Sequence, residues 1–271
     1  MNFYWYPFFL KHLVFWDRLA LGINFRGCSG EINRQPGAYH LSFTDDLYTL
    51  VPQLASTYQK IYMSGFSCGS NVIVNFLGQI GTDAKTKYNI HGAAVNSLPF
   101  DITITAPNLN GNNWFTTNVY GNDLKKKLQQ KLIDQSSSFQ LQNDQNKIVP
   151  YTIDEIKQCK TIKEFEELTV CPLYGFKDAV DYYTRSSCKD IIKNVSVPLY
   201  IINAQDDPFF QGDIHPTDLP TNVLLSYTEF GGHCGNILHR LSATKKGDQL
   251  PYASWLSTEF ARFVNHIDKK G

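Results

Sequence analysis

A serine flanked by two glycines is the feature of this sequence best suited to carry chemistry. The pattern is Gly65-x-Ser67-x-Gly69, which is typical of a serine exposed on a sharp turn between a strand and a helix. A strand-like apolar run precedes it and a helix-like apolar run follows it. The alternative is a chance match in a surface turn, because the pattern alone is common. In its context it predicts Ser67 as a nucleophile and the backbone N–H of Cys68, at the start of the helix, as a donor to an oxyanion.

A serine attacks an acyl carbon only if a base takes its proton and a carboxylate orients that base. In hydrolases built on a parallel sheet, the acid and the histidine follow the serine in that order, each just after a strand. Asp206 and Asp207 follow one apolar run, and His233 lies between glycines after the next run. We predict His233 as the general base. We assign Asp206 as its orienting carboxylate because it comes first after the strand, and Asp207 remains the alternative.

The elements that must position these residues alternate along the chain. Strand-like and helix-like patterns succeed one another, which is typical of a parallel sheet with helices on its faces. The predicted strands lie at 21–25, 61–63, 91–96, 197–204 and 223–227, and the predicted helices at 47–58, from 68 to Gly78 or Gly81, and at 256–267. Residues 42–45 resemble a capping box ahead of the first of these helices.

Residues 101–190 have a different character, mainly helical and polar. Because this block lies between two predicted strands, we expect a lid inserted over the sheet. A basic amphipathic helix is predicted at 123–134, with a solvated face preferred over a calmodulin or membrane role. A capping box at Thr161 predicts a helix to Leu168. Asn, Gln, Ser and Gly predict loops at 108–113 and 135–147.

Composition narrows the range of functions. The chain has 271 residues, with 25 basic and 25 acidic side chains and a formal net charge of zero, so no basic stripe indicates a nucleic-acid partner. Its six cysteines form no C-x-x-C pair, and we expect neither a zinc site nor a disulfide framework.

The first 18 residues form an atypical aromatic segment ahead of a domain predicted to span 19–267. They contain no run long enough to cross a bilayer and no basic start or small-residue cleavage site of a signal peptide. We therefore expect a cytoplasmic or membrane-associated protein, with contact to a membrane surface as one option and its oligomeric state open.

The chain resembles the YheT-like branch of the α/β-hydrolases, also called AB hydrolase family 4, which includes embryogenesis-associated and ABHD-type esterases. The resemblance runs from about residue 21 to about residue 264. The blocks that carry it are 24–31 (NFRGCSGE), 65–71 (GFSCGSN), 172–176 (PLYGF), 181–183 (DYY), 203–209 (NAQDDPF) and 231–235 (GGHCG).

This resemblance implies an α/β-hydrolase fold and hydrolysis of carboxylic esters, among them acylglycerols, phospholipids and short- or medium-chain esters, without a cofactor. It implies Ser67 as nucleophile, His233 as base and then acid, Asp206 as orienter and an acyl-enzyme intermediate. Some members of the family transfer medium-chain acyl groups to alcohols, so an acyltransferase is a variant of this hypothesis.

One departure from the family pattern bears on activity. Members of the family carry a His-Gly stretch before the R-G-C-S-G block, and its loop supplies a second oxyanion N–H. Residues 1–25 contain no His-Gly, so we expect the N-terminal strands to be missing or altered. Losing one oxyanion donor lowers turnover by about a hundred- to a thousand-fold. An impaired or non-catalytic acyl-binding protein with the same fold is therefore the alternative function.

Overall fold

A four-stranded parallel sheet forms the centre of the molecule. The computed structural model describes residues 19–141, 149–211, 217–235 and 255–270, so the predicted aromatic segment at 1–18 lies outside the described residues. Among them, the strands are β1 (Ile61–Phe66), β2 (Ile90–Asn96), β3 (Leu199–Ala204) and β4 (Val223–Thr228), in the order β1-β2-β3-β4. Every neighbouring pair is parallel, so all four carboxyl ends meet at one edge.

Each face of the sheet is covered by helices, because successive side chains of a strand point to opposite faces. On one face Ala93, Val95 and Ile201 pack with α3 (Cys68–Ile80) in the larger apolar core. On the other face Ala94 and Ile202 pack with apolar side chains of α12 (Trp255–Lys270). The prediction of a mostly parallel sheet flanked by helices is therefore confirmed.

In the described part of the chain, three further helical elements lie outside the segment between β2 and η3 and the two helices α3 and α12. They are α2 (Asp45–Thr57), α4 (Asp83–Thr86) and the 3-10 turn η3 (Ile191–Asn194). Gly78 in α3 lets η3 approach closely, since a Cβ there would lie 2.6 Å from the carbonyl oxygen of Ile191. Of the two predicted ends of the helix after Ser67, Gly78 and Gly81, the structure shows the second: α3 continues past Gly78 and is capped at Gly81.

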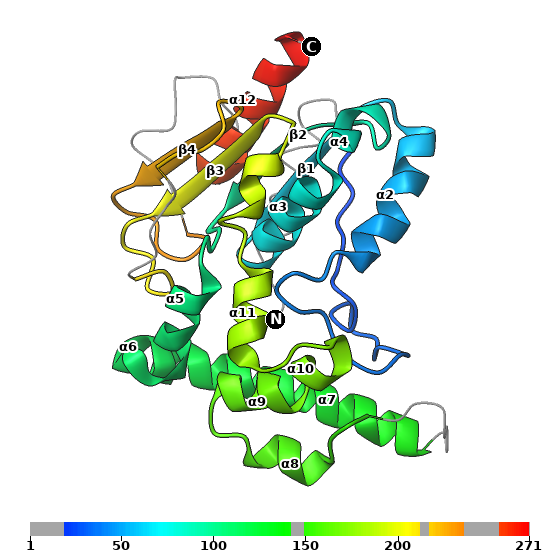
Figure 1. Ribbon diagram of the computed structural model, residues 1–271, viewed down its shortest axis with the longest axis vertical. Helices are drawn as coiled ribbons and strands as arrows, with labels where there is room; N and C mark the ends of the chain where they lie inside the picture. Colours follow the sequence, from blue (N-terminus) through cyan, green and yellow to red (C-terminus); the bar gives the residue numbers. More distant parts are fainter. Residues whose placement is uncertain (1–18, 142–148, 212–216, 236–254, 271) are drawn as a thin grey trace, which may run out of the picture.

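The described residues between β2 and η3 are mostly helical and form a separate layer below the sheet in Figure 1. Its elements are α5 (Ile102–Pro107), η1 (Asn108–Asn112), α6 (Trp114–Thr116), η2 (Thr117–Gly121), α7 (Asn122–Leu141), α8 (Ile153–Gln158), α9 (Ile162–Leu168), α10 (Val170–Tyr174) and α11 (Ala179–Ser186). Two apolar clusters of its own hold it together. That this layer acts as a lid stays a prediction.

Three local predictions were wrong. Residues 21–25 form no strand, and Leu21 and Ile23 are exposed, because alternation makes a strand only where a partner strand pairs with it. Residues 135–141 continue α7 instead of forming a loop. The predicted capping box at 42–45 does not form: the N-cap of α2 is Thr44, whose hydroxyl donates to Gln79 of α3 and makes no capping bond.

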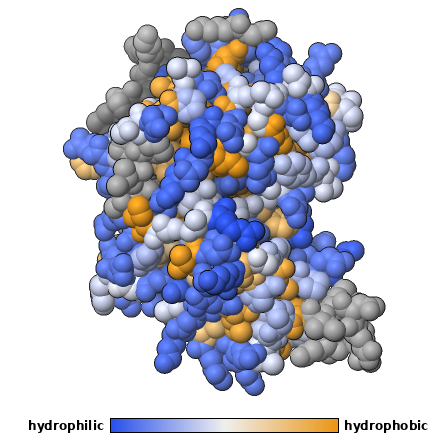
Figure 2. Space-filling model, in the orientation of Figure 1, coloured by the Kyte–Doolittle hydropathy of each residue, from blue (hydrophilic) through white to orange (hydrophobic). Residues whose placement is uncertain are grey.

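The surface in the view of Figure 2 is mainly hydrophilic, with small hydrophobic areas set between polar residues. On the right of this view the surface is hollowed between the upper and lower parts of the molecule. No helix among the described residues is both long and apolar enough to cross a membrane.

Candidate active site

Ser67 occupies a strained turn between β1 and α3. Its φ of 52° and ψ of −120° lie outside the regions that L-residues favour, and strain of this kind is found at functional sites. A Cβ on Gly65 would lie 2.7 Å from the backbone of Gly69. The glycine therefore lets strand and helix approach closely, as the motif predicted.

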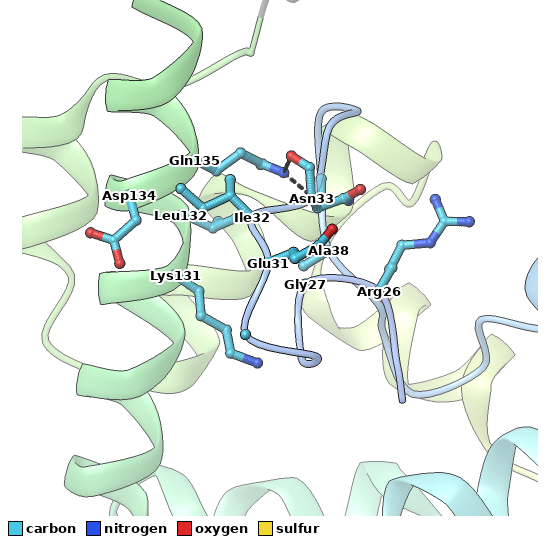
Figure 3. A pocket seen from close by; sticks show the side chains of 12 residues that line it. Arg26, Gly27, Glu31, Ile32, Asn33, Ala38, Lys131, Leu132, Asp134 and Gln135 are labelled. Carbon is cyan, nitrogen blue, oxygen red and sulfur yellow. Dashed lines mark hydrogen bonds between the residues drawn. The ribbon is translucent and has the colours of Figure 1, made fainter. Parts of the chain in front are cut away.

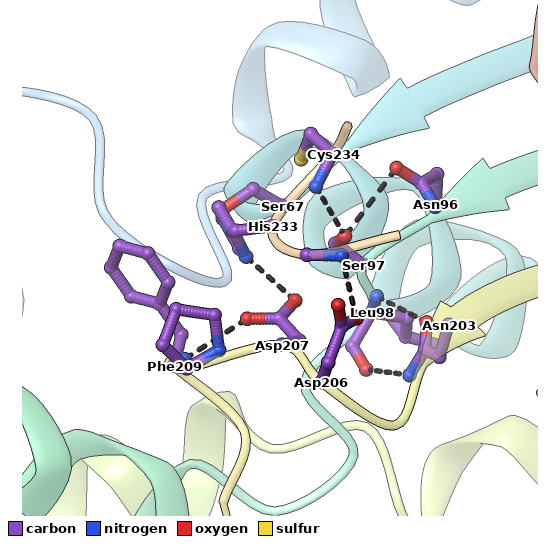
Figure 4. Close-up of polar contacts among 12 residues, drawn as sticks. Ser67, Asn96, Ser97, Leu98, Asn203, Asp206, Asp207, Phe209, His233 and Cys234 are labelled. Carbon is purple, nitrogen blue, oxygen red and sulfur yellow. Dashed lines mark hydrogen bonds and ion pairs between the residues drawn. The ribbon is translucent and has the colours of Figure 1, made fainter. Parts of the chain in front are cut away.

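His233 links the serine to a carboxylate. Its Nε2 lies 2.9 Å from Ser67 Oγ, and its Nδ1 lies 2.8 Å from Asp207 Oδ2. Figure 4 shows the three side chains converging from the turn after β1, the turn after β3 and the loop after β4. Asp207 is only 1% exposed, so its carboxylate is shielded from water and aimed at the imidazole.

Asp206 does not contact the imidazole, which corrects the prediction that it orients His233. It is exposed, and its Oδ1 accepts a hydrogen bond from the backbone N–H of Gly232 at 2.7 Å. The physical reason is the tight turn after β3, closed by the Asp207 N–H on the Ala204 carbonyl. This turn directs the first aspartate to solvent and the second into the site.

The loop that carries His233 is fixed on both sides of the histidine. Gly232 donates to Asp206, and the Cys234 N–H donates to Ser97 Oγ at 3.0 Å. Gly232 and Cys234 both have positive φ, 54° and 63°, so His233 lies between two left-handed residues. These two hydrogen bonds hold the backbone on either side of His233 in one conformation.

Ser97 was not predicted as a site residue. It is fully buried, directly follows β2 and has a φ of 52°, as Ser67 does after β1. Its position at a strand end in a parallel sheet was a usable signal. Beside it, the Asn203 side chain bonds both the N–H and the carbonyl of Leu98, each at 2.9 Å, which fixes the end of β2 against β3.

The pKa of His233 reflects opposing influences. Burial disfavours the imidazolium and lowers the pKa, but the hydrogen bonds with Asp207 and Cys234 outweigh burial and raise it above its usual 6.5. Phe209 and Phe210 border the ring, with centroids 4.1 and 5.4 Å from the imidazole. Both aromatic rings shield the base from water.

Cys68 begins α3, directly after the serine. The first N–H groups of a helix lack acceptors within the helix, so the predicted oxyanion role of its backbone is consistent with this position. The Cys68 thiol, in contrast to the backbone N–H, is not suited to take part in the chemistry. Burial raises the pKa of the Cys68 thiol to about 12, which keeps it protonated and unreactive.

A separate pocket of about 140 Å³ lies between the loop at residues 26–38 and α7. Lys131, Leu132, Asp134 and Gln135 line it from the helix, and Figure 3 shows Lys131 and Gln135 extending toward the loop. None of the lining residues belongs to the Ser67–His233–Asp207 group. Among the described residues no cluster of three or more His, Cys, Asp or Glu side chains is arranged to hold a metal ion.

Comparison with known proteins identifies relatives with named activities. The chain is 28% identical over 245 residues to YheT of Escherichia coli, covering 89% of this chain and 68% of that protein. It is 29% identical to the monoacylglycerol lipase of Saccharomyces cerevisiae, covering 81% and 48%. It is also 29% identical to human phospholipase ABHD3, covering 78% and 50%. The chain thus spans only about half the length of the last two relatives. No family model matches the chain.

Proposed function

Because the chain belongs to the YheT-like branch of the α/β-hydrolases, we propose that it hydrolyses carboxylic esters, with acylglycerols and short- or medium-chain esters as the substrate classes. The observation that supports this most directly is the unbroken hydrogen-bonded series from Ser67 through His233 to Asp207. Two relatives named as lipases, one for monoacylglycerols and one for phospholipids, support the ester class.

In the proposed first half-reaction, Ser67 Oγ attacks the ester carbonyl carbon while His233 Nε2 takes the hydroxyl proton. Asp207 accepts the Nδ1–H bond, which holds the productive tautomer and stabilises the imidazolium. The backbone N–H of Cys68 donates to the carbonyl oxygen as it becomes negative. The intermediate then collapses, the alcohol leaves with the proton from His233, and the acyl group remains on Ser67.

In the second half-reaction, water takes the place of the alcohol. His233 removes a proton from the water as it attacks the acyl-serine, and then returns that proton to Ser67 Oγ as the carboxylic acid departs. The same groups therefore serve both steps. An alcohol that replaced this water would give a new ester, which is the acyl-transfer variant of the same chemistry.

Labelling with a fluorophosphonate tests the proposal, since only an activated serine reacts rapidly with such a probe. Wild-type protein should be labelled, and Ser67→Ala and His233→Ala should not. Folded wild-type protein that fails both to label and to hydrolyse a p-nitrophenyl ester would exclude catalysis and leave the acyl-binding alternative.

The two adjacent aspartates provide a matched pair of variants that tests which carboxylate orients His233. Asp207→Asn should lower kcat by about 10⁴-fold, because an amide favours the wrong tautomer of His233. Asp206→Asn keeps an acceptor for Gly232 and should stay within about tenfold of wild type. Steady-state hydrolysis of the same p-nitrophenyl ester measures both, and the reverse order of effects would restore Asp206 as the orienting residue.

A further inference from the structure

Four large apolar side chains are exposed within seven residues of the helical layer. Trp114 is 76% exposed, Phe115 54%, Val119 47% and Tyr120 40%. We call these four residues the aromatic patch. Isolated exposed apolar residues are ordinary, but a cluster of this kind marks a surface that contacts something apolar.

The sequence around the aromatic patch carries no charge. Between Asp101 and Asp123 there is no Asp, Glu, Lys, Arg or His, and the polar residues are Thr and Asn. Trp and Tyr favour the boundary between lipid and water, where an apolar ring and a polar edge are both satisfied. An uncharged segment also loses no ionic hydration when it enters that boundary. This chemistry fits a lipid surface.

The aromatic patch is continuous with the candidate active site. Ring centroids lie 6.2 Å apart for Phe115 and Tyr120, 5.1 Å for Tyr120 and Phe209, and 4.1 Å for Phe209 and His233. A row of aromatic rings thus leads from the exposed surface to the histidine beside Ser67.

Hydrogen bonds fix this row to the loop that carries Asp207. Thr116 Oγ1 donates to the Pro208 carbonyl at 3.2 Å, and the Asn108 amide donates to the carbonyls of Phe209 and Gln211 at 3.1 and 2.9 Å. The position of the aromatic patch relative to the site is therefore defined by the fold, not by a free loop.

We propose that the aromatic patch docks on a lipid–water interface and that esters held in this interface reach Ser67 along Tyr120 and Phe209. The docking rests on the exposed patch itself, and only the delivery of esters rests on the proposed function. Burying Trp114 and Phe115 in lipid supplies the free energy of docking through the removal of apolar surface from water.

Sedimentation with phosphatidylcholine vesicles tests the docking without reference to catalysis. The double variant Trp114→Ser/Phe115→Ser should lose at least tenfold in vesicle partitioning, while its circular dichroism should match wild type. Val180→Ser in α11 (59% exposed) and Tyr58→Ser after α2 (40% exposed) remove exposed apolar surface elsewhere on the molecule. Both controls should sediment as wild type does.

Two results of this experiment would overturn the docking proposal. One is equal vesicle partitioning of the double variant and wild type. The other is a wild-type dimer that the double variant dissociates, with no vesicle binding by either protein, since a second copy of the chain would then cover the patch.

A kinetic comparison tests the delivery of esters. For the double variant, turnover of an acylglycerol in vesicles should fall at least tenfold relative to turnover of a water-soluble short-chain ester. An equal fall for both esters would overturn delivery through the patch. Absence of soluble-ester turnover in wild type would instead count against the proposed function, and vesicle partitioning would still decide the docking.

Discussion

At the scale of single residues, the proposed mechanism makes the reactivity of Ser67 depend on the protonation of His233. Only the neutral imidazole accepts the serine proton, and its hydrogen bonds with Asp207 and Cys234 raise its pKa above 6.5. A raised pKa keeps the base protonated, and thus inactive, to higher pH. The rising limb of activity must therefore lie at a higher pH than for a free histidine.

We predict that kcat/KM for a soluble ester rises with pH with a midpoint above 6.5. Asp206→Asn should leave this midpoint in place, because Asp206 contacts the Gly232 backbone and not the imidazole. The pH–rate profile of both proteins measures it. A wild-type midpoint at or below 6.5 would show that burial outweighs the hydrogen bonds with Asp207 and Cys234 in setting the pKa of His233.

Residue types and order led to Ser67 and His233, which lie in contact in the structure, but they could not choose between Asp206 and Asp207. The two aspartates are chemically identical neighbours, and only the turn after β3 buries one and exposes the other. Ser97 was missed for a related reason: its contact with the Cys234 N–H joins positions 137 residues apart. Local sequence carries no record of such a contact.

At the scale of elements, the two glycines of the serine motif differ in how closely other atoms surround them. A Cβ on Gly65 would meet the Gly69 backbone at 2.7 Å, whereas a Cβ on Gly69 would meet only the ring of Phe25 at 4.0 Å. Gly65 is required by the close approach of β1 and α3, while Gly69 is a helical position with room for a methyl group.

We therefore predict that Gly65→Ala lowers the free energy of unfolding by about 1–3 kcal/mol, because backbone must shift to admit the methyl group. Gly69→Ala should be neutral or stabilising by about 0.5–1 kcal/mol, since alanine favours a helix over glycine. Urea unfolding measures both variants. Equal losses of unfolding free energy in the two variants would show that the turn around Ser67 has the same need for both glycines.

Buried helices and strands were predictable from their apolar pattern, but the pattern did not show which apolar segment lacks a partner strand. The helix after Ser67 and the strands β2, β3 and β4 follow from their apolar pattern, and Gly81 ends the helix. The alternating residues 21–25 carry the same signal as a strand but form none, and Leu21 and Ile23 remain exposed. A segment with this pattern becomes a strand only if it pairs with a neighbouring strand, and the pattern does not show whether such a neighbour exists.

At the scale of the whole molecule, one buried acid couples the helical layer to pH. Glu166 in α9 is 9% exposed and hydrogen-bonds to the hydroxyl of Tyr183 in α11. Burial raises the pKa of Glu166 from 4.5 to about 8, although the bond from Tyr183 opposes the shift. The folded protein therefore holds a proton on this group at a pH where the unfolded chain has released it.

We predict that this group's contribution to stability is fully present below pH 4.5 and declines up to about pH 8. The decline is about 1.4 kcal/mol per pH unit, because folding must keep a proton that the unfolded chain releases. Glu166→Gln should flatten the decline, and Glu167→Gln, at the exposed neighbouring position, should not. Urea unfolding across this pH range measures it, and an unchanged slope in Glu166→Gln would refute the assignment.

The strand order also determines when the catalytic groups come together as the chain folds. β1 and β2 are close in sequence, but residues 97–198 separate β2 from its neighbour β3. Pairings between distant segments form late, because the entropy of closing a long loop must be overcome first. During synthesis the ribosome also delivers Ser67 well before Asp207 and His233. In the proposed mechanism the nascent chain would thus carry Ser67 before His233 and Asp207, and it would become reactive only when the last parallel strands have joined the sheet.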